Sequence, residues 1–214
     1  KPPAPADGPS LLGRFLDGVV LLRDGVRTAV DLSALGGRLL QQNVIERNRD
    51  AVLPLAAKKT RLNVATGAAR SLSICRFPFD EFAAIAKAHG ATVNDLVMTL
   101  CDLAVHRYLA ERGDPPAEPL VAYMPVNLRA EGADEGNVIS LLQVRLASEH
   151  DDPLTALAQI RKASKSTREI YGGISRSAVQ LYSLAVALLP LGVELTGLDR
   201  LLPPAINLVI SNVP

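Results

Sequence analysis

The chain has 214 residues, of which 48% are hydrophobic and 21% are charged, which excludes a disordered segment and provides ample length for a core. Its net charge of +1 argues against a bulk electrostatic attraction to nucleic acid or to anionic lipid. Aromatic residues make up only 4% and Trp is absent, so Leu, Val and Ala must fill the interior.

The first third of the chain combines a linker pattern with helical patterns. Residues 1–10 are rich in Pro, Ala and Gly and predict a linker. Apolar residues at helical spacing over 11–45 predict two or three short helices, broken near Gly25 and near the Gly36–Gly37 pair. Residues 46–69 mix basic residues with Pro and Gly and predict irregular structure.

The rest of the chain alternates strand and helix patterns. Leu72, Ile74 and Phe77 alternate with polar neighbours and predict a strand over 70–77. Further strands are expected at 120–128, 137–147 and 205–210, and helices at 78–88, 93–112, 152–170 and 175–189. Long helices mixed with short apolar strands predict a layered α/β or α+β domain.

Two apolar features bear on the environment of the protein. Cys75 and Cys101 lie in apolar contexts, which favours buried free thiols in a reducing compartment over a disulfide. The most apolar stretch, 178–195, contains Gln180, Pro190 and Glu194, so a helix buried against protein or lying at a lipid surface is favoured over a membrane span.

The stretch Thr92-Val93-Asn94-Asp95 has two interpretations. Thr92 and Asp95 have the spacing of a capping box, which alone would account for both residues. Capping does not account for Asn94, and the helix that follows is apolar on nearly every face. A buried Asn or Asp without hydrogen-bond partners would cost about 1–3 kcal/mol, so partners are expected.

The three histidines are the first candidates for a general base. His89 precedes a helix-stopping Gly and is expected to be exposed, His106 fits a packed or surface position, and His150 fits a polar loop beside two Asp. The sequence has no Gly-x-Ser-x-Gly elbow, phosphate-binding loop, dinucleotide fingerprint or clustered metal-ligand motif. The basic residues between 47 and 61 predict a solvated loop, which would also suit the phosphates of coenzyme A.

Four motifs follow one another in a specific order. They are Asn94-Asp95, Met124-Pro125-Val126-Asn127-Leu128-Arg129, Gly136-Asn137 and Asn207-Leu208-Val209-Ile210-Ser211-Asn212-Val213-Pro214. This order resembles the C-terminal part of the bacterial wax ester synthase/diacylglycerol acyltransferase family. The similarity runs from about Arg70 to Pro214, and residues 11–45 are similar to the family's interdomain region. We therefore expect interdomain linker and helices at 1–69 and a C-terminal half-domain at 70–214.

The resemblance implies an α/β fold of the chloramphenicol acetyltransferase and condensation-domain type, with two similar halves that meet at a tunnel. It implies transfer of a fatty acyl group from acyl-CoA, as co-substrate and without a cofactor, to a fatty alcohol or diacylglycerol. The family's general base lies in a His-His-x-x-x-Asp-Gly motif, which this sequence lacks. We therefore expect a partner, the N-terminal half of the same enzyme, and one wall of an apolar cleft in this chain.

Site residues follow from the matched motifs. The resemblance implies Asn94 and Asp95 as supporting active-site residues, and Asn127, Arg129, Ser211 and Asn212 as the region that binds substrate or coenzyme A. No metal and no nucleic acid are expected. The expected location is the cytoplasm, with peripheral contact to the inner membrane or lipid droplets. Two alternatives stay open: condensation on a carrier-bound thioester, and a non-catalytic lipid-binding module.

Overall fold

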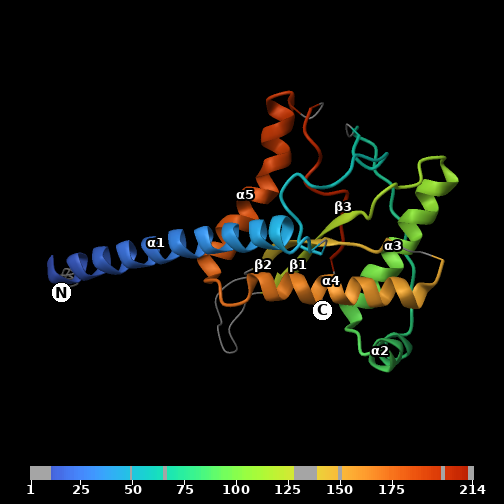
Figure 1. The fold of residues 1–214 in the computed structure, drawn as a ribbon, viewed down its shortest axis with the longest axis horizontal. Coiled ribbons are helices and arrows are strands. Elements are labelled where there is room, and N and C mark those ends of the chain that lie inside the picture. Colours follow the sequence, from blue (N-terminus) through green and yellow to red (C-terminus); the bar gives the residue numbers. More distant parts are fainter. Residues whose placement is uncertain are drawn as a thin grey trace, which may run out of the picture.

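Three strands form a sheet with helices on both of its faces in the computed structural model, which confirms a mixed α/β class (Figure 1). The structure describes residues 11–48, 50–64, 67–127, 139–148, 151–198 and 201–211. The elements are α1 (Leu11–Leu40), the π-helix η1 (Gln41–Ile45), α2 (Phe79–Ala88), α3 (Val93–Glu111), β1 (Val121–Asn127), β2 (Ile139–Arg145), α4 (Pro153–Tyr171), α5 (Arg176–Leu195) and β3 (Leu208–Val209).

The sheet has the order β2-β1-β3, and its central strand β1 is buried on both faces from Val121 to Met124. β1 pairs antiparallel with β2, from Val121 opposite Arg145 to Asn127 opposite Ile139, and parallel with β3. Alternate residues of β1 face different helices: Ala122 and Met124 pack in a cluster with residues of α3 and α4, and the Tyr123 hydroxyl donates to a carbonyl of α5. Burial on both faces explains why β1 is apolar almost throughout.

Local sequence signals place three helices where they were predicted. Thr92 and Asp95 form a complete capping box at the start of α3. The Asp152 side chain accepts from two backbone N–H groups at the start of α4, where Pro occupies the first helical position. α2 ends at His89 and Gly90, and Gly90 has the positive φ of +60° that favours glycine.

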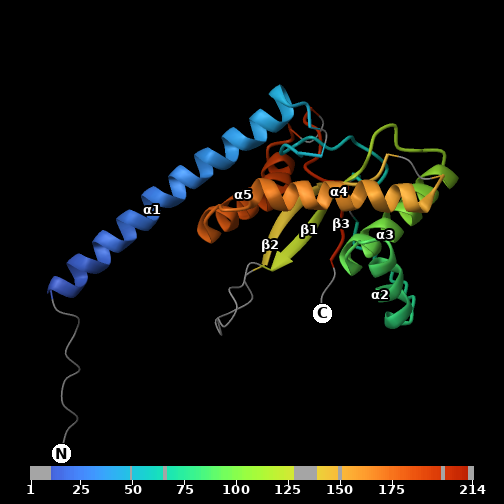
Figure 2. The same cartoon turned by 60° about the horizontal axis from the view of Figure 1, so that its bottom comes forward.

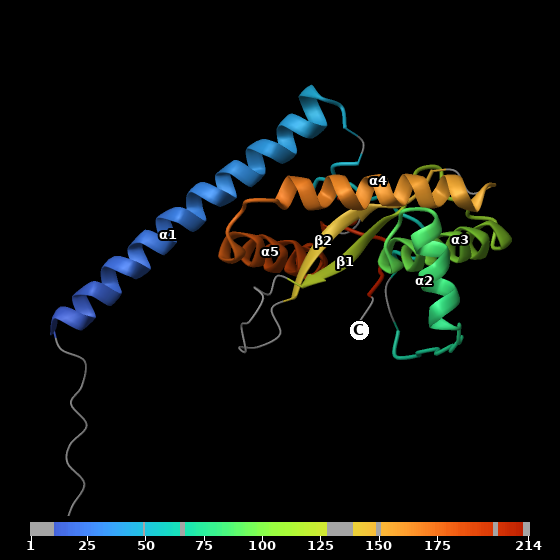
Figure 3. The ribbon, with the colours of Figure 1, turned by 90° about the horizontal axis from the view of Figure 1, so that it is seen from below.

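The prediction of two or three short helices over 11–45 is wrong, because α1 is one continuous helix that η1 extends. Each internal glycine costs only about 1 kcal/mol relative to Ala, which is too little to end a helix that packs elsewhere. Leu35 and Leu39 are buried, and Arg38 donates to the carbonyl oxygens of Ile170 and Gly172. The N-terminal turns of α1 extend away from the other elements (Figure 2 and Figure 3).

The strand predicted over 70–77 is also wrong for this structure. Residues 71–78 have no regular secondary structure, and every side chain from 67 to 81 is exposed. Alternation of apolar and polar residues favours a strand only where a neighbouring strand supplies hydrogen bonds and a covered face. None of the described strands lies beside this segment. Residues 46–69 are irregular where they are described, as predicted.

The last strand is shorter than the predicted 205–210. The Asn207 side chain explains part of the difference, because its Oδ1 accepts from Val121 N–H at 2.9 Å. The backbone N–H of Asn207 donates to Val121 C=O at 2.8 Å. A side chain thus takes the place of a backbone partner, and regular pairing begins only at Leu208. Ile210 N–H continues it by donating to Tyr123 C=O.

α5 runs six residues beyond its predicted end at 189, through Pro190. Proline lacks the N–H that would bond to the carbonyl four residues earlier, which is that of Val186. The Tyr123 hydroxyl donates to this carbonyl at 2.7 Å, so the oxygen keeps a partner and the helix continues. Burial raises the pKa of Tyr123 to about 12, with a contribution from Tyr182, so the hydroxyl stays protonated as this bond requires.

The two cysteines are free, as predicted, but only Cys101 is partly buried and Cys75 is exposed. The expectation of burial for Cys75 is therefore wrong, because the segment around it has no covering element. Among the described residues, one helix is long and apolar enough to cross a membrane, at Arg176–Val193 in α5, and only 22% of that stretch is buried.

Candidate functional site

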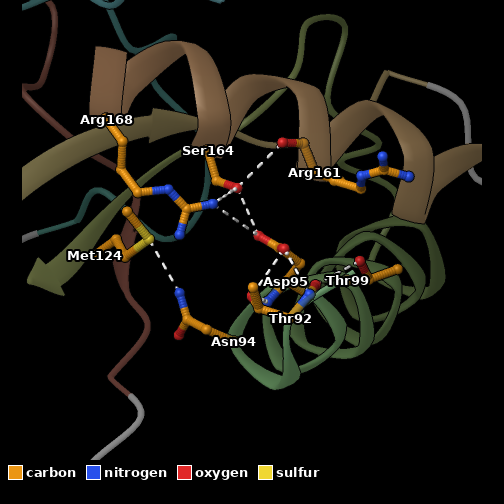
Figure 4. Close-up of polar contacts among 8 residues, drawn as sticks. All are labelled: Thr92, Asn94, Asp95, Thr99, Met124, Arg161, Ser164 and Arg168. Atoms are coloured by element: carbon orange, nitrogen blue, oxygen red, sulfur yellow. Dashed lines mark hydrogen bonds and ion pairs between the residues drawn. The ribbon is translucent and has the colours of Figure 1, made fainter. Parts of the chain in front are cut away.

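Asp95 is the centre of a polar network between α3 and α4 (Figure 4). Its side chain is 1% exposed. Oδ2 accepts from Thr92 N–H at 2.9 Å and from the Thr92 hydroxyl at 2.8 Å, while Oδ1 accepts from the Ser164 hydroxyl at 2.5 Å. The Arg168 guanidinium of α4 lies 3.9 Å from Oδ1. Both carboxylate oxygens are therefore engaged within the fold, as a buried carboxylate requires.

This arrangement gives Asp95 a bracing role. The carboxylate holds the first turn of α3 through Thr92 and holds α4 through Ser164, which is itself fully buried. Arg168 also donates to the Ser164 hydroxyl at 3.2 Å, so one cation supports two members of the network. A carboxylate whose two oxygens are both engaged by donors of the fold is suited to fixing a helix pair.

Asn94 lies beside Asp95 but points toward β1 instead of α4 (Figure 4). Its Nδ2 donates to the Met124 Sδ at 3.0 Å, and its side chain is half-buried. Thioether sulfur is a weak acceptor. Within the part of the chain that the structure describes, the Asn94 Oδ1 has no hydrogen-bond partner. Asn94 thus offers an amide oxygen that the fold does not use.

The sheet brings two other predicted site positions, Asn127 and Ser211, to one of its edges. β1 and β3 are parallel, so their carboxyl ends, at Asn127 and just before Ser211, lie at one edge of the sheet. Met124, the partner of Asn94, is the middle residue of β1. Ser211 is exposed. The side chain of Asn127 and the whole of Arg129 and Asn212 lie outside the described residues.

Neither of the described histidines contributes a side-chain hydrogen bond to this network. His106 Nδ1 lies 2.9 Å from Asp102 Oδ1, and Asp102 Oδ2 accepts from Ala147 N–H, so the pair fixes α3 to the end of β2. Eleven residues of helix place His106 about 16 Å along the axis from Asp95. His89 is exposed at the end of α2, as expected. His150 lies outside the described residues.

Neither of two cavities on the described surface borders Asn94 or Asp95. One lies between η1 and α4 and is lined by residues that include Arg38, Asn48 and Glu169. The other lies beside the start of β1 and is lined by Arg145 and Lys162 together with the acids Asp50 and Glu118. The acidic residues offset the positive charge of the basic residues that line this second cavity, since Lys162 lies 3.0 Å from Asp50. Lys58 of the basic loop lies 3.4 Å from Glu118.

Sequence reasoning missed Ser164 and Arg168. Both lie on α4, whose buried face also carries Ile160 and Thr167. A usable signal was present, because a Ser and a Thr at helical spacing within an apolar face predict a buried polar partner on a neighbouring element. That signal could not identify Asp95 as the partner of Ser164, because Ser164 and Asp95 are 69 positions apart in the sequence.

Two family models match this chain. The model described as the wax ester synthase/diacylglycerol acyltransferase catalytic domain matches residues 4–97. The model described as the WS/DGAT C-terminal domain matches residues 135–214. The two matches cover the network residue Asp95 on one side and Ser164 and Arg168 on the other.

Similar proteins carry acyltransferase names. A Mycobacterium tuberculosis protein named as a diacylglycerol O-acyltransferase is 35% identical over 83% of this chain and 39% of its own length. The O-acyltransferase WSD of Acinetobacter baylyi is 31% identical over 90% of this chain and 43% of its own length. The solved wax ester synthase/diacylglycerol acyltransferase from Marinobacter aquaeolei VT8 is 26% identical over 87% of this chain and 39% of that chain, with a TM-score of 0.49. The chain spans about two fifths of the length of these relatives.

Proposed function

Because the chain belongs to the wax ester synthase/diacylglycerol acyltransferase family, we propose that it is part of an acyl-CoA-dependent O-acyltransferase. The acceptor is a fatty alcohol or a diacylglycerol, and the product is a wax ester or a triacylglycerol. The observation that carries the proposal is the match of the family's catalytic and C-terminal models, in that order, to one chain. The O-acyltransferase name of the Acinetobacter relative supports the reaction class.

The proposed reaction is a direct transfer. A general base removes the proton of the acceptor hydroxyl, the oxygen attacks the thioester carbonyl carbon, the carbon–sulfur bond breaks, and coenzyme A leaves as a thiol after taking up the proton. The His-His-x-x-x-Asp-Gly motif of the family is missing from this sequence. We therefore assign the base to the N-terminal half of the enzyme and expect this chain to be inactive alone. Acyl-CoA is a co-substrate, and no resident cofactor is needed.

In this proposal the chain contributes one wall of the substrate cleft. Asn94 presents its unused amide oxygen beside the middle of β1, while Asp95 keeps the first turn of α3 fixed. An amide oxygen in that position would accept a hydrogen bond from a donor on the facing half or on the substrate. Ser211 lies at the same edge of the sheet and would contact the substrate or coenzyme A.

The cytoplasm is the proposed location, with peripheral contact to a membrane or lipid droplet through α5. Five leucines at helical spacing on this helix are between 49% and 77% exposed: Leu181, Leu184, Leu188, Leu191 and Leu195. An apolar stripe of this kind suits a helix that lies in a lipid surface. Water-insoluble acceptors would reach the enzyme from that surface.

The test measures coenzyme A release by the chain alone, by its N-terminal half alone, and by the two together. Palmitoyl-CoA with hexadecanol or a diacylglycerol should be consumed only when both halves are present. Consumption of a palmitoyl-carrier protein in place of the free thioester would support the condensation alternative. A well-folded complex that consumes neither would identify a lipid-binding module.

A single substitution then tests the role of this chain. Asn94→Ala in the complete enzyme should lower turnover about 10- to 100-fold, less than the roughly 100- to 1,000-fold seen when an oxyanion-hole donor is lost, because Asn94 supports the site through its amide oxygen. The midpoint of thermal unfolding should change little, because the side chain's one described bond is to a thioether. Asn43→Ala removes a similarly half-buried amide on η1, and it should leave turnover unchanged. Normal turnover of the Asn94 variant would remove this residue from the site.

A further inference from the structure

The segment Ser71–Phe77, here called the 71–77 segment, exposes an unusual amount of apolar surface. Leu72 is 87% exposed, Ile74 75% and Phe77 65%. Single exposed apolar side chains are common, but three within six residues of one extended stretch mark a surface that a partner covers. Figure 3 shows the segment as a loop without regular secondary structure that leads into α2.

The backbone of the 71–77 segment is as unpaired as its side chains. None of its N–H or C=O groups forms a hydrogen bond with another residue in the described part of the chain. The sequence has the β-branched and aromatic residues of a strand, and an extended backbone with free donors and acceptors is a template for another strand. The partner that would satisfy these backbone groups is therefore the edge of a β-sheet.

The chain is anchored to the fold on either side of the segment, at Asn63 and in α2. On the N-terminal side, the Asn63 side chain donates to Ile206 C=O and accepts from Asn207 Nδ2, each at 2.8 Å. On the C-terminal side, α2 buries Ala86, and Ala91 N–H donates to its carbonyl at 2.8 Å. Fixed ends reduce the conformational entropy that the segment would lose on pairing.

Charge disfavours one register of self-association. In an antiparallel pairing of two copies centred on Ser73, Arg70 of each copy would lie opposite Arg76 of the other. Like charges directly opposite each other destabilise a strand pair. A sheet edge in a different polypeptide region carries no such penalty.

We propose that the 71–77 segment is a β-strand that pairs with the edge of the sheet in the N-terminal half of the enzyme. The partner rests on the proposed function, but the pairing itself rests on the exposed backbone and side chains. The family's catalytic-domain match covers residues 4–97 and so includes the segment. More than half of each matched relative lies outside the region shared with this chain, which leaves ample polypeptide for a second sheet.

Amide hydrogen exchange tests the pairing directly. The amides of residues 72–77 should exchange at the rate of an unfolded peptide in the isolated 214-residue chain, and at least about 100-fold more slowly in the complete enzyme. Rapid exchange in both proteins would overturn the proposal. Slow exchange already in the isolated chain would also overturn it, because the partner would then lie within this chain or in a second copy.

Side-chain variants supply an independent measurement. The double variant Leu72→Ser and Ile74→Ser should weaken association of the separately produced halves at least about tenfold. Val64→Ser, at a 63% exposed position of the same irregular region, should change the dissociation constant less than about twofold. Equal effects of the two would contradict the proposal. A complex with protected 72–77 amides but no acyltransferase activity would refute the proposed function and leave the strand pairing intact.

Discussion

At the scale of single residues, the carboxylate of Asp95 stabilises two helices at once. Asp95→Ala should lower the free energy of unfolding by about 2–4 kcal/mol, since it removes a cap and a charge-assisted bond and leaves the buried Ser164 hydroxyl with only its longer contact to Arg161 C=O, at 3.3 Å. Urea unfolding followed by circular dichroism measures this loss. Asp80→Ala is the matched control, because Asp80 is an exposed acid in the first turn of α2 and should cost less than about 0.5 kcal/mol.

A double-mutant cycle with Ser164→Ala separates the link to α4 from the capping of α3. We expect the two substitutions to be non-additive by about 1–2 kcal/mol, because each removes the same 2.5 Å bond. Additive losses would show that the two helices are held by apolar packing alone.

Local spacing was sufficient to predict half of this network. Thr92 and Asp95 are three residues apart, so the capping box follows from the sequence alone. The link to α4 depends on how two helices pack, which no local pattern contains. The same limit applies to Asn94, whose partner Met124 is 30 positions away. Prediction from the sequence was therefore reliable for caps and unreliable for contacts between elements.

At the scale of elements, α1 shows how glycine misleads a prediction of helix ends. A Cβ added at Gly37 would meet nothing within 4 Å, and the residue lies inside a helix that already packs through Leu35 and Leu39. Gly37→Ala should therefore raise the free energy of unfolding by about 0.5–1 kcal/mol, since the variant loses less backbone entropy on folding.

The control for this prediction is a position where the backbone conformation requires glycine. Gly173 has a φ of +73°, so Gly173→Ala should destabilise the fold by about 1 kcal/mol although its surroundings are also open. Thermal or urea unfolding of both variants measures the two changes in the free energy of unfolding. A Gly37 variant that is less stable than the parent would mean that α1 is strained at this position.

The strands differ in how far the sequence determined them. β1 and β2 follow their predicted ranges within two residues, because their apolar runs are buried on both sides by this chain. The 71–77 segment has a strand pattern but no strand partner among the described residues, so its pattern is not realised here. Near β3 a side-chain amide replaces a backbone bond. An alternating pattern indicates a preference for extended backbone, and a strand forms only where a neighbouring strand pairs with it.

At the scale of the whole molecule, the exposed leucines of α5 predict how the protein meets lipid. Leu184→Ser combined with Leu188→Ser should weaken binding to phosphatidylcholine vesicles containing dioleoylglycerol at least about tenfold, because each buried leucine contributes roughly 1.5–3 kcal/mol. Vesicle flotation measures the bound fraction. Binding by the parent should resist added salt, since α5 contains one Arg and one Glu and the net charge is only +1.

The control lies on another helix. Val30→Ser changes a 61% exposed apolar residue of α1 and should leave vesicle binding unchanged. Equal losses for the α1 and α5 variants would mean that lipid contact is not confined to α5. Binding that vanishes in high salt would indicate an electrostatic attraction in place of the leucine stripe.

The length of α1 gives it the properties of a lever. Thirty residues of α-helix extend about 45 Å. Its described contacts with the other helices lie in the C-terminal two thirds, where Thr28 meets Ser177, Asp31 accepts from Ser175 N–H, and Arg38 reaches the end of α4. A rotation of about 5° around Thr28 would move the opposite tip by about 2 Å, because some 17 residues of helix, roughly 26 Å, separate Thr28 from Leu11. The position of that tip would therefore depend on small adjustments where α1 packs against the other helices.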